Sequence, residues 1–146
     1  MDYDYNRKAF RSVIKAAGVD PLAGTYCLCV LLELSIKQHL ALCSSASNSG
    51  HDLPYLLQRV GLRHRTYHAV LNSLQLQLAN SLKALSSQGR DGQARFVPSN
   101  SYPHIRYLRH ASDWGTPSSS DSDIASLKGI LQRIISLLGK SLGIAV

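Results

Sequence analysis

One stretch of this 146-residue chain, residues 101–114 with the sequence SYPHIRYLRHASDW, combines arginine, histidine and aromatic side chains in a way that suits phosphate chemistry. Guanidinium groups can engage phosphates bidentately, and aromatic rings can stack on bases. Arg106 with His110 could also cleave RNA without a metal ion, because the histidine can move a proton while the arginine stabilises charge on the phosphorane. The alternative is that Tyr107 and Trp114 fill the core while the cations are solvated.

A second basic stretch lies where the fourth helix is expected to begin. His64 and His68 are four residues apart, so on one helix they would share a face, with Arg63 or Arg65 close by. This spacing can hold a metal ion, but no HExxH motif and no third ligand accompany it, so we predict a basic helix start and no metal site. Arg63 with His68 is a second arginine–histidine pair to consider for RNA cleavage. The residues predicted to bind a ligand are Arg63, His64, His68, Arg106, Tyr107 and Arg109.

The net charge of +7 is concentrated in one part of the sequence. Residues 53–110 hold eight arginines and lysines against one acidic residue, Asp91, whereas positive and negative charges balance in residues 1–52 and 111–146. A localised basic surface suggests a phosphate-bearing or acidic partner. A solvated basic face without a ligand is the simpler alternative.

The protein's only glutamate, Glu33, lies in its longest apolar run, Thr25–Cys43. A carboxylate in a helix that is apolar on most sides is costly unless it is paired. Lys37, one turn later, would form an exposed pair of little energetic value. We therefore predict that Glu33 contacts Arg106 or Tyr107 and anchors the basic stretch to the rest of the protein.

Apolar periodicity near 3.6 and capping signals predict an all-α fold, an antiparallel bundle of four long helices and one short helix. A long loop, from Gln88 to Pro103, precedes the last helix. Asp52 is expected to cap the short helix and Gly61 to end it. The predicted long helices span 2–17, 21–43 and about 63–87, and the last helix, which follows a polar linker, carries an apolar stripe from Ile124 to Leu142.

Length and composition fit a single domain, residues 1–146, with a proper core. No apolar run reaches the roughly 20 residues of a membrane span, and the N-terminus lacks an apolar signal core, so we expect a soluble cytoplasmic protein. Cys27 and Cys29 would face different ways on a helix, which makes them poor joint metal ligands.

The order of these features resembles the HEPN (higher eukaryotes and prokaryotes nucleotide-binding) superfamily. The similar motifs are ELSIK in the apolar helix, GHDLPYLL after a short loop, and IRY before the last helix. The resemblance covers most of the chain from about Pro21 onward. The positions that match its motifs are Glu33, Lys37, His51, Asp52, Arg106 and Tyr107.

The resemblance implies a helical bundle that often dimerises and needs no cofactor. Some members are metal-independent ribonucleases, often toxins or phage-defence effectors, and others bind nucleotides or partner a nucleotidyltransferase-like protein. The ribonucleases place four to six residues between arginine and histidine near the start of a late helix, whereas Arg106 and His110 have three between them. This departure favours a non-catalytic member that binds a nucleotide, RNA or a protein. An endoribonuclease and a structural protein–protein interaction module remain the alternatives.

Overall fold

The computed structural model describes residues 5, 7–9, 11, 12, 21–43, 51–86, 102 and 119–146. Its elements are α2 (Pro21–Cys43), α3 (Leu53–Arg63), the 3-10 turn η1 (Arg65–Tyr67), α4 (His68–Ser86) and α6 (Ser119–Leu142). The described part of the chain contains no β-strand, which confirms the all-α fold class.

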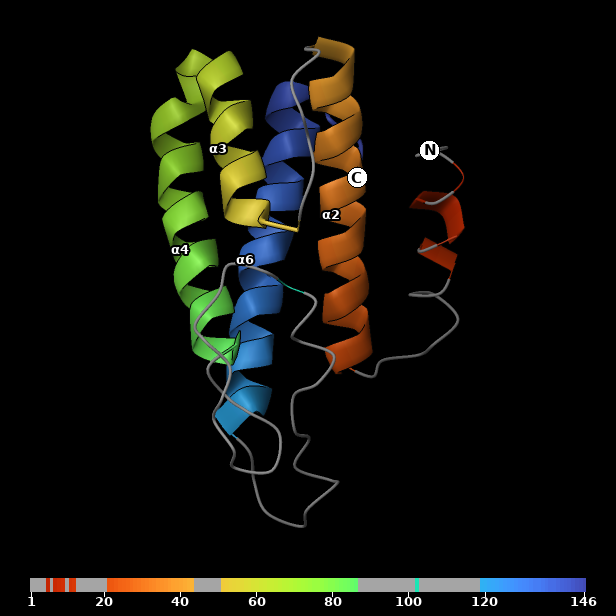
Figure 1. The fold of residues 1–146 in the computed structure, drawn as a ribbon, viewed down its shortest axis with the longest axis vertical. Helices are drawn as coiled ribbons and strands as arrows, with labels where there is room; N and C mark the ends of the chain where they lie inside the picture. Colours follow the sequence, from red (N-terminus) through yellow and green to blue (C-terminus); the bar gives the residue numbers. More distant parts are fainter. Residues whose placement is uncertain are drawn as a thin grey trace.

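Helices α2, α3, α4 and α6 lie side by side as a bundle, in which α4 runs opposite to the other three (Figure 1). His51, just before α3, reaches Glu33, whereas His64, at its end, reaches His39 further along α2, so α2 and α3 are parallel. The end of α6 lies beside the second half of α2. Helix α4 thus runs opposite to α2 and α6, the long helices before and after it, whereas the short helix α3 runs parallel to α2, and η1 reverses the chain between α3 and α4 (Figure 1).

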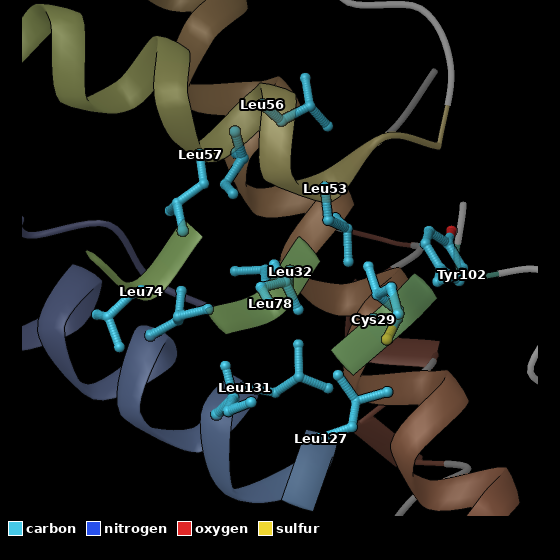
Figure 2. Close-up of a cluster of buried hydrophobic side chains, with 14 of the residues drawn as sticks. Cys29, Leu32, Leu53, Leu56, Leu57, Leu74, Leu78, Tyr102, Leu127 and Leu131 are labelled. Carbon is cyan, nitrogen blue, oxygen red and sulfur yellow. The ribbon is translucent and has the colours of Figure 1, made fainter. Parts of the chain in front are cut away.

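Helix α2 is buried on most of its circumference, as its sequence predicts. An unbroken run of its residues, 29 to 36, is buried, and Leu32, Ile36 and Leu40 have no exposed surface. Their leucine and isoleucine partners come from one face each of α3, α4 and α6 (Figure 2). At about 25 cal/mol per Å² of buried apolar surface, this shared core is the main source of stability for the bundle.

The prediction that Gly61 ends the short helix is wrong. Helix α3 continues to Arg63, and Gly61 is buried inside it. Glycine ends helices by adopting a positive φ, and among the described glycines only Gly143 does so, with φ 65° after α6. Gly61 instead sits where α3 meets α4, and a Cβ added there would lie 3.6 Å from the Leu71 Cβ.

The described residues near the N-terminus are helical, in line with the helix expected there. Arg7 Nη1 donates a 2.6 Å hydrogen bond to the carbonyl of Ala145, and Arg11 Nη2 donates to the carbonyl of Val146. These bonds join the N-terminal segment to the residues after α6. None of the described helices is long and apolar enough to cross a membrane.

Candidate functional site

Glu33 forms the centre of a polar cluster inside the bundle. Its carboxylate is almost fully buried, and it accepts hydrogen bonds from Lys37 Nζ at 2.6 Å and from His51 Nδ1 at 2.9 Å. The hydroxyl of Tyr102 is a third hydrogen-bond partner. The buried carboxylate is therefore fully compensated, which is what a charge in an apolar helix requires.

Burial alone would raise the pKa of Glu33, but the three hydrogen bonds and the charge of Lys37 outweigh it, so the pKa is below its ordinary value. Burial and the hydrogen bond to Glu33 raise the pKa of Tyr102, which therefore stays a neutral donor. Burial, and then the negative charge of Glu33, likewise raise the pKa of Cys29, so its thiol is not a nucleophile at neutral pH.

Tyr102 is the only described residue between α4 and α6, and it lies in the core of the bundle. It is 3% exposed, and its ring packs against Tyr26 and, edge to face, against His51. Glu33 thus anchors the start of the 101–114 stretch through Tyr102. The predicted contact of Glu33 with Arg106 or Tyr107 stays a prediction, because both lie outside the described residues.

Lys37 is not the exposed partner that its one-turn spacing suggests. Its side chain is only 14% exposed, so the ion pair with Glu33 is screened much less than a surface pair. Asp52 does act as the cap of α3: its carboxylate accepts a 2.9 Å hydrogen bond from the backbone N–H of Tyr55. A carboxylate that caps a helix start is also favoured by the helix dipole.

The predicted ligand-binding residues around the α3–α4 junction lie together, but not in the expected geometry. His64 follows the end of α3 and His68 starts α4, with η1 between them, so the two histidines do not share a helix face. The helix expected to start at Arg63 fails to form there because α3 itself extends to that residue. We call the group formed by Arg59, Arg63, His64, Arg65 and His68 the basic corner.

Two open hollows indent the basic corner on either side of Leu62, whose side chain is 62% exposed. One, of about 430 Å³, is lined by Arg59, Leu62 and Arg63. The other, of about 310 Å³, is lined by Leu62, Arg65 and His68. Nearby, the guanidinium of Arg59 lies 6.0 Å from the ring centre of the half-exposed Tyr55. This combination of cations with an exposed ring and an exposed leucine suits stacking and phosphate contact.

His39 on α2 is a site residue that the sequence did not reveal. Its Nε2 lies 3.0 Å from Nε2 of His64, and the two rings stack with centroids 5.2 Å apart. One ring must donate and the other accept, so the contact holds only while one of them is neutral. Burial, then the positive charges of His64 and Arg63, lower the pKa of His39. No local pattern pairs residues 39 and 64, since only the packing of α2 on α3 brings them together.

Arg109 and His110 also lie outside the described residues, so the predicted Arg106–His110 pair stays a prediction. Within the described part of the chain, no group of three or more histidine, cysteine or acidic residues could hold a metal ion. No family model, curated protein or solved structure matches this chain.

Proposed function

We propose that this chain is a HEPN-like helical domain that binds RNA or a nucleotide through its basic corner. The observation that carries the proposal is the surplus of positive charge in this part of the chain. Residues 53–86 contain four arginines and lysines and no aspartate or glutamate. Asp52, the adjacent acid, is engaged in capping α3. A cluster of cationic side chains at the surface attracts phosphates strongly.

The shape of the corner favours a nucleic acid over an unstructured acidic chain. Its cations line two hollows that meet at Leu62, and Tyr55 offers an exposed ring close to them. Aromatic and guanidinium faces stack on bases without regard to sequence. Binding is therefore expected to be salt-sensitive and to have little sequence preference.

The test is fluorescence anisotropy with labelled single-stranded RNA over a range of salt concentrations. Replacing Arg59, Arg63 and Arg65 together by glutamine should weaken binding by about tenfold or more and reduce the salt slope by about 2, since each phosphate contact in a single strand contributes about 0.7.

The matched control removes the same charge from α6, with glutamine in place of Lys128, Arg133 and Lys140. This control should lose far less affinity than the corner variant. Equal losses in the two variants would mean that the net charge alone, and not the corner, attracts RNA.

A metal-independent endoribonuclease is the second candidate function. It is favoured by the exposure of His68, which shares a hollow with Arg65 beside Arg63. Incubation of total RNA with the protein in EDTA should then give cleavage that a His68→Ala or an Arg106→Ala/His110→Ala variant lacks. RNA binding without cleavage would exclude the enzyme, and neither binding nor cleavage would favour a protein-interaction module.

The resemblance also underlies two further parts of the proposal. One is that the domain forms a homodimer, which sedimentation of the purified protein would test. The other is a role in a toxin–antitoxin or phage-defence pair, with a nucleotidyltransferase-like or other protein as partner. A pull-down from the native host would identify that partner.

A further inference from the structure

A third hollow lies where the N-terminal segment, α2 and the residues after α6 meet. It measures about 200 Å³, and its lining consists of Arg7, Ser35, Gln38, His39 and the backbone-rich segment 143–145. Sites for drug-sized ligands measure roughly 300–1,000 Å³. This hollow therefore fits a small ligand or one end of a larger one.

Ser35 lines this hollow with a hydroxyl group that makes no hydrogen bond to the described protein. The residue is 2% exposed, and its Oγ is buried without a hydrogen-bond partner among the described residues. By contrast, Glu33, two residues earlier on the same helix, accepts hydrogen bonds from Lys37 and His51. A buried hydroxyl without a partner is destabilising, and a ligand oxygen in the hollow would remove that cost.

The charges around the hollow select an anion. Arg7 is held in place by its 2.6 Å hydrogen bond to the carbonyl of Ala145 and supplies the positive charge, and the ring of His39 adds a polar group to the lining. None of the described lining residues is acidic. Gln38 adds an amide donor and Ser35 a hydroxyl donor.

We propose that this hollow binds the phosphate group of a phosphomonoester. A tetrahedral phosphate presents three terminal oxygens in different directions, which matches donors that come from two separate segments, Arg7 on one side and residues 35–39 of α2 on the other. Arginine engages such oxygens bidentately. The phosphomonoester can be a free nucleotide or the 5′ end of an RNA.

The hollow adjoins the basic corner through the 3.0 Å contact between His39 and His64. An RNA lying on the corner can therefore place its terminal phosphate in the hollow. The proposal that the hollow binds the 5′ end of an RNA rests on the proposed function, whereas the proposal that it binds a free nucleotide does not.

The test is calorimetric titration with inorganic phosphate, with AMP, and with one short RNA carrying either a 5′-phosphate or a 5′-hydroxyl. Phosphate and AMP should bind saturably, and acetate should not. If the RNA end is the natural occupant, the 5′-phosphorylated RNA should bind about tenfold tighter than its 5′-hydroxyl form. Equal RNA affinities with saturable AMP binding assign the site to free nucleotides.

Arg7→Gln should weaken AMP binding by about tenfold or more, because a charge-assisted hydrogen bond is lost. Lys8→Gln removes the same charge from an exposed neighbour and should change the affinity by less than about twofold. Ser35→Ala should weaken binding several-fold without destabilising the fold, since it deletes an oxygen that has no partner.

The inference is overturned if neither phosphate nor AMP binds saturably, if acetate binds as well as phosphate, or if Arg7→Gln and Lys8→Gln lose equal affinity. The basic-corner variant separates this inference from the proposed function. AMP binding that survives in that variant, alongside weak RNA binding in the unaltered protein, would contradict the proposed function and leave the phosphate site standing.

Discussion

Glu33 and His39 lie six residues apart on α2, and the pKa of each is lowered for opposite reasons. The pKa of Glu33 falls because three donors surround its charge, so the carboxylate stays ionised inside the bundle. The pKa of His39 falls because burial and its positive neighbours, His64 and Arg63, disfavour a further charge. Glu33 is thus compensated within the protein, whereas the basic corner near His39 brings groups of the same charge together.

This difference separates a structural role from a binding role. The Glu33 cluster has its hydrogen bonds satisfied by the protein itself, and it joins α2 to His51 and to Tyr102. The basic corner presents exposed arginines with no acidic residue in the surrounding segment. Variants of the cluster should therefore affect folding, and variants of the corner should affect ligand binding.

The largest effect is expected for Glu33→Gln. The substitution keeps the shape of the side chain but leaves Lys37 without its counter-charge and puts an amide donor against other donors. The free energy of unfolding should fall by about 3 kcal/mol, as for other buried pairs that lose one partner. Urea unfolding followed by circular dichroism measures this change.

The basic-corner variant serves as the contrast in the same experiment. Replacing Arg59, Arg63 and Arg65 by glutamine should change the unfolding free energy by no more than about 1.5 kcal/mol, or about 0.5 kcal/mol for each surface substitution. A Glu33→Gln protein as stable as the unaltered one would show that the cluster is not a structural anchor.

A smaller effect is expected for Tyr102→Phe. The ring keeps its packing against Tyr26 and His51, but the carboxylate of Glu33 loses one donor. The loss of a hydrogen bond to a charged group should reduce the unfolding free energy by about 1–2 kcal/mol. Tyr26→Phe, which leaves the Glu33 hydrogen bonds in place, is the matched control, and an equal loss in both variants would contradict the anchoring role of the Tyr102 hydroxyl.

The last prediction concerns the stability of the fold at acidic pH. Because the pKa of Glu33 is lower in the folded protein than its ordinary value of 4.5, the unfolded chain takes up this proton first as the pH falls. The stabilisation from Glu33 is fully present above pH 4.5 and is lost as the pH falls through the lower, folded-state pKa. The stability gap between the unaltered protein and Glu33→Gln should therefore shrink on acidification below pH 4.5, and a gap that stays constant there would contradict the prediction.

The helices themselves followed from local rules. The apolar run around Leu32 predicted a buried central helix, and Asp52 with Pro54 in the first turn predicted the start of α3. Both signals depend on residues within one or two turns of each other, which is the range over which helix periodicity and capping act. The concentration of positive charge was equally predictable, because counting charged residues along the sequence is enough to locate it.

At Gly61 and His64, the predictions made from neighbouring residues in the sequence were wrong. Glycine lowers helix propensity, but burial between α3 and α4 favours a helical Gly61, and tertiary packing outweighs a cost of about 1 kcal/mol. Because α3 extends to Arg63, His64 lies outside α4 and does not share a helix with His68.

The sequence by itself therefore determined the all-α class, the central helix, the need of Glu33 for a partner and the position of the basic surplus. Only the tertiary structure decided which residues come together: Tyr102 and His51 at Glu33, His39 at His64, and Arg7 with Ser35 in the lining of one hollow. The physical reason is that helix formation depends on neighbours along the chain, whereas these contacts depend on which helix faces pack, and that is fixed by the burial of the whole core at once.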